Sequence, residues 1–369
     1  MHADLTAAAS FDPTPWVAQG RRPGAIVAVL SGGEVMSWSS RGRVSVGEDD
    51  GPLTPETVFY VASVSKQFTA ACVAVCEMDG LIDVDASIRI WLPTLPLHFQ
   101  PITPRLLIHH VGGLPPGPEQ LVHAPGPPNQ WWRDLGLWDL VEVLSKEERL
   151  MWPPGSRYSY ANTGYWLLAA IVERASGQTL GAFARERLFA PLGMTMTRFR
   201  EDPDEPQPTL APGHLFADGA YHPVRTRFHG VGDGGLLTSI EDLAKWDLFW
   251  SGRSILGREL PSRLLDRGRL NGGARLYYAW GVTARTHRGV RIISHGGRFI
   301  GYLSKLVRFP DQDLSLACLA NTEDIDVDKL TMSLADLVLG NIVDPTAPSW
   351  ADTLRDDALD VGTNDFRGV

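Results

Sequence analysis

A serine and a lysine stand three residues apart, at Ser63 and Lys66, where an apolar strand-like run meets an apolar helical run. Residues 58–62 have the composition of a strand, and apolar residues after Lys66 recur at helical spacing. A lysine three residues beyond a serine on a helix lies one turn away on the same face. A partly desolvated amine beside a hydroxyl loses its proton more readily and can act as a base. The pair suggests a serine nucleophile activated by lysine, although four-residue patterns of this kind also occur by chance.

Two further motifs follow in a fixed order. Tyr160-Ala161-Asn162 precedes a long apolar helical pattern, and His295-Gly296-Gly297 follows a strand-like run. In this order of motifs the chain resembles the serine β-lactamase and penicillin-binding-protein superfamily. It looks most similar to the Tyr-x-Asn group, which includes class C β-lactamases, D,D-peptidases, D-aminopeptidases and esterases. The resemblance covers roughly residues 20–343, and the flanking segments 106–115 and 232–243 support it.

The resemblance implies an α+β fold, in which an antiparallel sheet is flanked by helices in an α/β/α sandwich and carries an inserted all-helical lobe. We expect a single catalytic domain over residues 1–343. Its sheet lobe is predicted at about residues 1–62 and 226–343, and its helical lobe at about residues 67–225. Residues 344–369 are acidic and lack periodicity, which predicts a loosely held tail.

Local patterns predict the elements that position these motifs. Strands are predicted at 24–30, 35–40, 279–286, 290–294, 302–309 and 314–320, the last four as consecutive antiparallel neighbours. Helices are predicted at 67–78, 106–109, 137–144, 165–176, 180–188, 236–250 and 326–342, with a short one within 5–20. Residues 115–130 are rich in proline and glycine and are predicted to be a loop.

Composition narrows the class of protein. The chain has 369 residues, of which 44% are hydrophobic and 21% charged, as in ordinary globular proteins. Its formal net charge of −9 argues against a general nucleic-acid-binding role. Residues 1–20 lack the apolar core of a signal peptide and no apolar stretch is long enough to span a membrane, so we expect a cytoplasmic protein without membrane partners. The cysteines lack metal-ligand spacing and are expected to be buried; they are Cys72, Cys76 and Cys318.

The resemblance implies a mechanism without a metal or another cofactor. Ser63 would attack an acyl carbon and form an acyl-enzyme. Lys66 and Tyr160 would handle the proton, and the sequence leaves open which of them takes it from the serine. A neighbouring lysine is expected to favour the anionic form of the phenol. Asn162 would orient Lys66 and the substrate amide, because its side chain both donates and accepts hydrogen bonds.

The third motif bears on the choice of substrate. His295 stands in the place of the lysine of the family's Lys-Thr-Gly motif, and we expect it to be charged only part of the time near neutral pH. That difference disfavours strong β-lactamase activity and favours an amidase, an aminopeptidase or an esterase. Gly296 and Gly297 leave room for substrate along the strand edge. By resemblance, the backbone N–H groups of Ser63 and Arg298 would form the oxyanion hole.

Other patterns have weaker support. Residues 230–235 match Gly-x-Gly-x-x-Gly but lack the strand and the βαβ unit of a dinucleotide site, so a tight loop lining the cleft is expected. Asp233 in this loop either points into the site or stabilises the turn. His109 and His110 have no metal-ligand pattern around them and are expected to be structural. Three tryptophans either wall an apolar acyl pocket or simply pack: Trp131, Trp132 and Trp152.

The motifs together predict a serine hydrolase that acts through an acyl-enzyme on an ester, an amide or a peptide bond of a D-amino acid. Its partner would be a small-molecule or peptide acyl substrate. An acyltransferase or peptide cyclase on the same scaffold is an alternative, because motifs do not encode whether water or another acceptor attacks. A catalytically silent homologue used for binding is another alternative. The sequence leaves the oligomeric state open.

Overall fold

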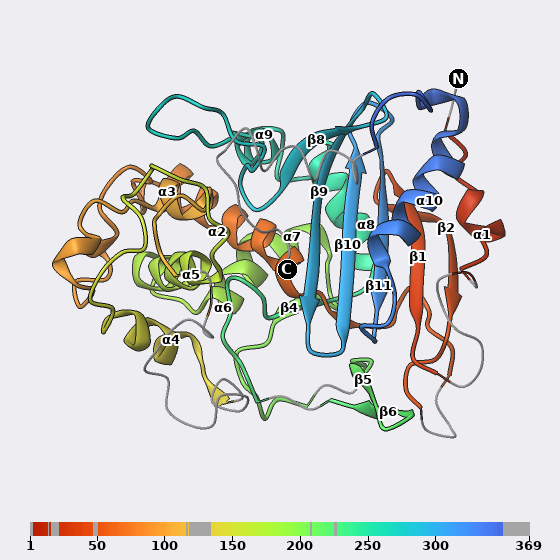
Figure 1. Ribbon diagram of the computed structural model, residues 1–369, viewed down its shortest axis with the longest axis horizontal. Coiled ribbons are helices and arrows are strands. Elements are labelled where there is room, and N and C mark those ends of the chain that lie inside the picture. The colour runs from red at the N-terminus through yellow and green to blue at the C-terminus, as the bar shows by residue number, and fades with distance from the viewer. Residues whose placement is uncertain are drawn as a thin grey trace.

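A six-stranded antiparallel sheet with the order β2-β1-β11-β10-β9-β8 organises the structure. The computed structural model describes residues 3–13, 15, 22–46, 51–115, 117, 134–206, 209–224 and 227–349. Pairing of β1 with β11 joins the two ends of the chain in one sheet (Figure 1). The strands are β1 (Ala25–Ser31), β2 (Glu34–Arg41), β8 (Thr283–His287), β9 (Val290–Phe299), β10 (Tyr302–Phe309) and β11 (Leu314–Ala320).

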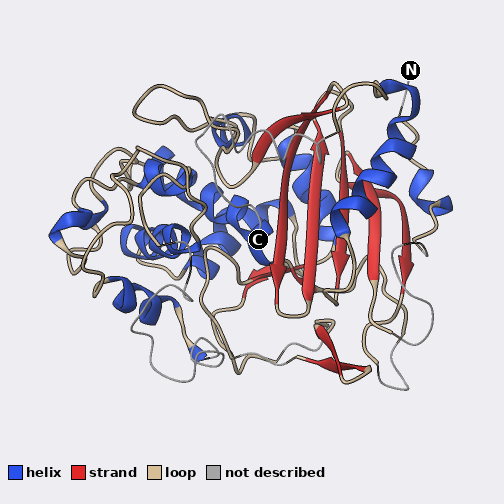
Figure 2. Ribbon diagram, in the orientation of Figure 1, coloured by secondary structure: helices blue, strands red, loops and turns tan. Residues whose placement is uncertain are grey.

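Helices cover both faces of this sheet (Figure 2). Helices α1 (Ala7–Ser10) and α10 (Val327–Leu339, followed by a 3-10 turn at Gly340–Ile342) pack on one face. Helix α8 (Ile240–Trp250) packs on the other face, and α2 (Lys66–Met78) belongs to the same apolar cluster. Central strands are therefore apolar on both sides, and all seven residues of β11 are buried. The sandwich of sheet and helices confirms the predicted fold class.

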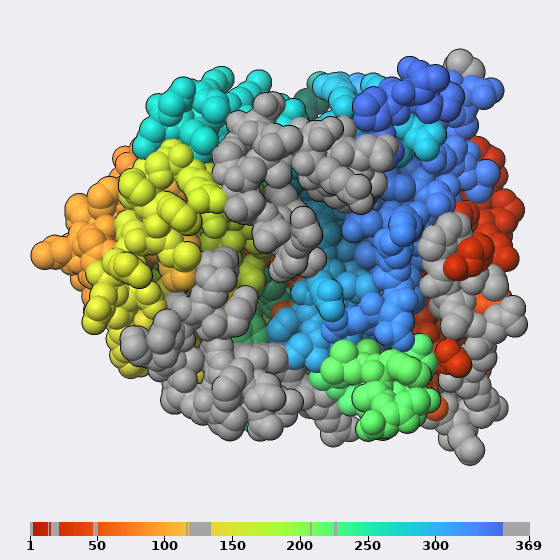
Figure 3. All heavy atoms as spheres, in the orientation of Figure 1, coloured from red at the N-terminus to blue at the C-terminus, as the bar shows by residue number. Residues whose placement is uncertain are grey.

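A group of helices lies beside the sheet and forms a separate region of the surface (Figure 3). Its centre is α5 (Asn162–Ser176), in which residues 163–172 are buried and which packs against α2, α3, α4 and α6. The other helical elements are 3-10 turns at Ile88–Ile90 and Leu97–Phe99, α3 (Pro104–Ile108), α4 (Leu137–Leu144), α6 (Leu180–Ala184), a π-helical turn at Arg185–Phe189, α7 (Ala190–Leu192) and α9 (Glu259–Leu264). The division into a sheet lobe and a helical lobe stays a prediction.

Short strands are the main difference from the predicted elements. A three-stranded sheet has the order β3-β7-β4, and β5 pairs with β6 in a hairpin. Residues 67–225 are therefore not purely helical. The short strands are β3 (Phe59–Tyr60), β4 (Arg198–Phe199), β5 (His214–Ala217), β6 (Ala220–Pro223) and β7 (Leu236–Thr238).

The predicted helix at 236–250 is wrong in its first turn. Residues 236–238 form β7 because they pair with β3 and β4, which lie far away in the sequence. Helix α8 starts after Ser239, whose hydroxyl accepts a hydrogen bond from the N–H of Asp242 at 3.2 Å. Strand β8 likewise starts at Thr283 rather than at residue 279, and β9 runs on through the glycine pair to Phe299.

Some predictions fall at the edge of what the structure describes. The predicted loop at 115–130 and the tail beyond residue 349 lie mostly or wholly outside the described residues. Of the helix expected within 5–20, the structure gives α1. In the described part of the chain, no helix combines the length and the apolar character needed to cross a membrane.

Candidate active site

Ser63 lies in a tight 3-10 turn, Ala62–Ser65, between β3 and α2. Ala62 has φ of +47°, in the left-handed region that costs energy for a residue with a Cβ. The Ser65 hydroxyl donates to the Ala62 carbonyl at 2.5 Å and accepts from the Leu236 N–H at 3.2 Å. These contacts fix the strained turn from both sides. Ser63, 8% exposed, is thereby presented just before the positive end of α2.

Lys66 is fully buried and brings three parts of the chain together. Its Nζ lies 3.0 Å from Oγ of Ser63, 2.8 Å from Oδ1 of Asn162 and 2.8 Å from the carbonyl oxygen of Asp233. Burial lowers the pKa of Lys66 to about 8, and the nearby charge of Asp233 opposes that shift. The amine is therefore available in its neutral form near physiological pH.

The partners of Lys66 also orient its lone pair. A neutral amine has two N–H donors and one lone pair, whereas the two carbonyl oxygens, from Asn162 and Asp233, can only accept. With both N–H groups donated to these oxygens, the lone pair faces the hydroxyl of Ser63. Ser63 then donates its proton to Nζ, which is the geometry that a general base requires.

Tyr160 lies directly before α5, next to this cluster. Nζ of Lys66 is 4.9 Å from the centroid of its ring. Burial raises the pKa of Tyr160 well above its usual value, and the nearby Ser63 hydroxyl lowers it by a smaller amount. Tyr160 is thus a neutral phenol at physiological pH. The prediction of an anionic Tyr160 beside the lysine is wrong, because burial of the phenol raises its pKa.

The ring of His110 packs against the ring of Tyr160, a specific contact that the sequence did not predict. The two ring centroids are 4.2 Å apart, and Nδ1 of His110 accepts a hydrogen bond from the N–H of Ala161 at 3.1 Å. His110 itself has φ of +56°. Burial, followed by the charge of Lys66, keeps the pKa of His110 well below its usual value, so the ring is neutral. His110 holds the Tyr-x-Asn loop in place, and the double histidine was the only sequence signal for it.

His295 is buried in β9 and is neutral. Its Nδ1 lies 2.6 Å from the carbonyl oxygen of Gly296, which can only accept, and its Nε2 lies 3.0 Å from the hydroxyl of Tyr278. Nδ1 therefore carries the proton, and Nε2 accepts from the phenol. Burial, with a smaller effect from Lys66, lowers the pKa of His295 to about 3. The expectation of a partly charged histidine at neutral pH is wrong.

Strand β9 approaches the nucleophile at Gly297. A Cβ at this position would collide with the Val61 carbonyl and the Ser304 hydroxyl and would lie 3.0 Å from the backbone nitrogen of Ser63. The Ser304 hydroxyl donates to the Val61 carbonyl at 2.7 Å and ties β10 to the same turn. Only glycine allows the strand to lie this close to Ser63.

Gly297→Ala is expected to lower kcat for an ester substrate by at least about 100-fold, because it would push β9 away from the Ser63 backbone and disturb oxyanion binding. The measurement is p-nitrophenol release from p-nitrophenyl acetate, together with thermal unfolding. Gly296→Ala is the matched control, since its Cβ would meet no atom closer than 3.6 Å. It should lose less than about tenfold; equal losses in both variants would contradict this account of the close approach.

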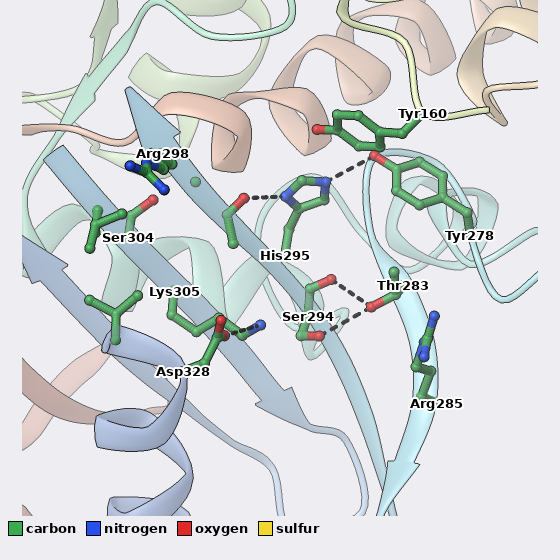
Figure 4. A pocket seen from close by; sticks show the side chains of 14 residues that line it. Tyr160, Tyr278, Thr283, Arg285, Ser294, His295, Arg298, Ser304, Lys305 and Asp328 are labelled. Atoms are coloured by element: carbon green, nitrogen blue, oxygen red, sulfur yellow. Dashed lines mark hydrogen bonds and ion pairs between the residues drawn. The ribbon is translucent and has the colours of Figure 1, made fainter. Parts of the chain in front are cut away.

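The remaining predicted residues take different positions. The Asp233 carboxylate accepts from Nε1 of Trp166 at 2.6 Å, so Asp233 reaches Lys66 through its carbonyl rather than through its side chain. Burial raises the pKa of Asp233, and Lys66 opposes that shift. The Arg298 side chain pairs with Glu323 at 2.6 Å. It lies apart from His295 (Figure 4), so only the backbone of Arg298 is a candidate for the oxyanion hole.

A pocket with roughly 820 Å³ of empty space, part of it open to solvent, lies along β9 (Figure 4). Its lining includes Tyr160, His295, Gly296, Gly297 and Arg298. Five residues that the sequence predicted for the site therefore share one cavity next to the Ser63 turn.

The secondary candidates are structural in the described part of the chain. The ring nitrogens of His109 face the carbonyl oxygens of Arg105 and Asp266 at 2.9 and 3.0 Å. No three metal-ligating side chains of the described residues gather into a cluster. Trp152 packs under the guanidinium of Arg157 at 4.4 Å, whereas Trp131 and Trp132 lie outside the described residues. All three cysteines are buried, and burial raises the pKa of each thiol.

Comparison with known proteins agrees with this geometry. The model of the Beta-lactamase family matches residues 11–339, so the chain belongs to that family. Penicillin-binding protein 4* of Bacillus subtilis (strain 168) is 27% identical over 344 residues, which cover 85% of this chain and 71% of the relative. A D-aminopeptidase of Gluconobacter oxydans is 26% identical over 81% of this chain but only 56% of its own length. The chain thus spans little more than half of such D-aminopeptidases.

Solved structures show the same fold. The octameric penicillin-binding protein homologue from Pyrococcus abyssi superposes with a TM-score of 0.76 and 25% identity, over 86% of this chain and 74% of that one. The D-amino acid amidase from Ochrobactrum anthropi SV3 superposes with a TM-score of 0.67 and 23% identity, over 87% of this chain and 94% of that one. The latter likeness concerns the fold alone.

Proposed function

We propose that the protein is a serine hydrolase that cleaves esters or amides through an acyl-enzyme on Ser63. One observation carries the proposal: Lys66 is buried, and its Nζ lies 3.0 Å from Oγ of Ser63 while its other two contacts are oxygens that can only accept. Backbone strain and a buried amine both cost stability, and such features concentrate at active sites. Family membership supports the same reaction class.

The proposed reaction has two halves. Lys66 takes the Ser63 proton while Oγ forms a bond to the acyl carbon, and the negative charge on the carbonyl oxygen faces the N–H groups of Ser63 and Arg298. The bond to the leaving group then breaks. The departing oxygen or nitrogen takes a proton from the Tyr160 hydroxyl, which regains one from the Lys66 ammonium. Water repeats the sequence in reverse and releases the acid.

The substrate class is proposed from the relatives. Several of them are D-aminopeptidases, which supports an amide or peptide of a D-amino acid as the natural substrate. Among the described residues that line the pocket along β9, Asp328 is the one carboxylate. A free amine of the substrate therefore has a single acidic partner there. The cytoplasmic location expected from the sequence stays a prediction, which cell fractionation would test.

Covalent labelling tests the proposal without any substitution. A fluorophosphonate probe should react once per chain, because an activated serine attacks phosphorus while ordinary serines do not. Tryptic digestion places Ser63 and Ser65 in one peptide that ends at Lys66. Fragmentation should assign the label to Ser63. A label on Ser65 would overturn the assignment of the nucleophile, and no labelling at all would favour a silent homologue.

A further inference from the structure

The Asp233 carboxylate has no part in the reaction steps proposed above, yet it is held firmly. It accepts a hydrogen bond from Nε1 of Trp166 at 2.6 Å, and Trp166 is a buried residue of α5 that is only 1% exposed. Burial raises the pKa of the carboxyl group, while Lys66, the Trp166 N–H and the backbone N–H groups of Asp233 and Gly234 act in the opposite direction. These N–H groups can only donate, so they favour the ionised carboxylate.

The loop around Asp233 is fixed on both sides. Gly232 has φ of +111°, and a Cβ there would lie 2.4 Å from a backbone oxygen of α5. The Gly232 carbonyl accepts from the Thr69 hydroxyl of α2 at 2.8 Å. Beyond Asp233, the N–H of Gly235 donates to the Tyr60 hydroxyl of β3 at 2.8 Å. Contacts before and after Asp233 therefore fix its backbone, and the tryptophan fixes its side chain.

Within the described part of the chain, Asp233 supplies the one charge that acts on the pKa of Lys66, and burial is the other cause of its shift. Two phenols and two imidazoles surround the amine and are neutral at pH 8. Nζ of Lys66 lies 4.9 and 5.5 Å from the two phenol ring centroids, and burial raises the pKa of both phenols. Burial lowers the pKa of both histidines. These four side chains are Tyr160 before α5, Tyr165 in α5, His110 after α3 and His295 in β9.

The carboxylate opposes the effect of burial on the amine. Burial alone would lower the pKa of Lys66 further, and the charge of Asp233 brings it back up to about 8. An amine with a lower pKa would be a weaker acceptor for the Ser63 proton. The same residue also directs the amine, because its carbonyl oxygen accepts from Nζ at 2.8 Å.

We propose that Trp166 and Asp233 are positioning residues for Lys66, in which the tryptophan fixes the carboxylate and the carboxylate keeps the neighbouring amine basic. This inference rests on the proposed function and deepens it, since it names the groups that set the pH range of the same site. Neither side chain needs to touch the substrate. Both act through the amine that takes the Ser63 proton.

Asp233→Asn tests the charge. The variant keeps the size of the side chain, an acceptor oxygen for Trp166 and the backbone carbonyl. The midpoint of the rise of kcat/KM with pH should move from about 8 to about 7, because the ammonium loses the charge that stabilises it. At pH 7 the variant should run at about half of its own plateau rate, whereas the wild type runs at about one tenth. The substrate is p-nitrophenyl acetate, and the rate with heat-denatured protein is subtracted at each pH.

Trp166→Phe tests the tryptophan separately, because it removes one N–H and keeps an aromatic ring in the buried space. The carboxylate keeps its charge, so the midpoint should stay within about 0.3 pH units of the wild type. The value of kcat should fall by about three- to tenfold with little change in KM, because Asp233 is held less firmly against the amine.

A second tryptophan–carboxylate pair provides matched controls. Nε1 of Trp138 donates to the Glu173 carboxylate at 2.8 Å, but this pair joins α4 to α5 at the surface, where Trp138 is 40% exposed. Trp138→Phe and Glu173→Gln remove the same bond and the same charge as the two test variants. Both should keep the midpoint and kcat of the wild type.

The possible outcomes separate this inference from the proposed function. A midpoint in Asp233→Asn within about 0.3 pH units of the wild type would refute the role of the carboxylate, and an unchanged kcat in Trp166→Phe would refute that of the tryptophan. The hydrolase proposal stands in both cases. If thermal unfolding shows that Trp166→Phe does not fold, Asp233→Asn decides, because it replaces no buried bulk. If the wild-type protein does not hydrolyse the ester above the heat-denatured level, the hydrolase proposal fails, and this inference fails with it.

Discussion

Ser63→Ala is expected to lower kcat for p-nitrophenyl acetate by about 100,000-fold, to near the rate without enzyme. The loss should be this large because the alternative nucleophiles near Lys66 are badly placed. The Ser65 hydroxyl is engaged in hydrogen bonds with the Ala62 carbonyl and the Leu236 N–H, whereas Lys66 Nζ contacts the hydroxyl of Ser63. Water would have to enter the space left by Oγ and attack without forming an acyl-enzyme.

The measurement is p-nitrophenol release under single-turnover conditions, with intact mass spectrometry to detect the acyl-enzyme. Ser65→Ala is the control for the turn. It should lower thermal stability because two hydrogen bonds are lost, but it should keep kcat within about tenfold of the wild type. If Ser63→Ala still accumulates an acetylated species, another residue is the nucleophile.

The order of three motifs was sufficient to predict which residues meet at the site. Ser63 and Asn162 are 99 residues apart in the chain, yet both contact Lys66 in the structure. The resemblance that the motifs carry also implied the architecture, and the pairing of β1 with β11 brings the two ends of the chain into one sheet as expected. The roles of these residues in catalysis stay predictions until they are measured.

What the sequence could not provide was the electrostatic environment. Both incorrect charge predictions, for Tyr160 and His295, assumed the usual behaviour of a side chain near water or near a lysine. Burial decides the outcome at both positions, and burial depends on residues far away in the sequence, such as His110 under Tyr160 and Tyr278 beside His295. A local sequence pattern does not identify these neighbours, so it does not predict the pKa shifts that burial causes.

The same limit explains the residues that the sequence did not single out. Lys305 occupies an apolar strand pattern, in which one lysine looks like an exposed edge residue. Only the pairing of β10 with β9 places it opposite Gly296, and only the packing of α10 brings Asp328 to it. Residues 236–238 were predicted as helix for a related reason, since both of their strand partners, β3 and β4, lie more than 30 residues earlier in the sequence.

Lys66→Met is expected to lower kcat/KM by about 1,000- to 10,000-fold, at the upper end of what general base catalysis contributes. The wild-type pH profile carries more information than this loss. Burial lowers the pKa of Lys66 to about 8, and the neutral amine is the active form. Activity should therefore rise about tenfold per pH unit up to pH 8 and level off above it.

Two further variants test whether Lys66 acts as the base, acts only as a positive charge, or leaves the role of base to Tyr160. Tyr160→Phe should slow the reaction but keep the inflection near pH 8, because the titrating group is still present. Lys66→Arg keeps a positive charge yet cannot lose it at any accessible pH. Provided that circular dichroism shows Lys66→Arg to be folded, it should be as inactive as Lys66→Met if the amine removes the Ser63 proton. Substantial activity in Lys66→Arg, or an inflection near pH 8 that survives in Lys66→Met, would mean that a group other than Lys66 accepts the Ser63 proton. If that group is Tyr160, the substrate complex would have to lower the raised pKa of its phenol.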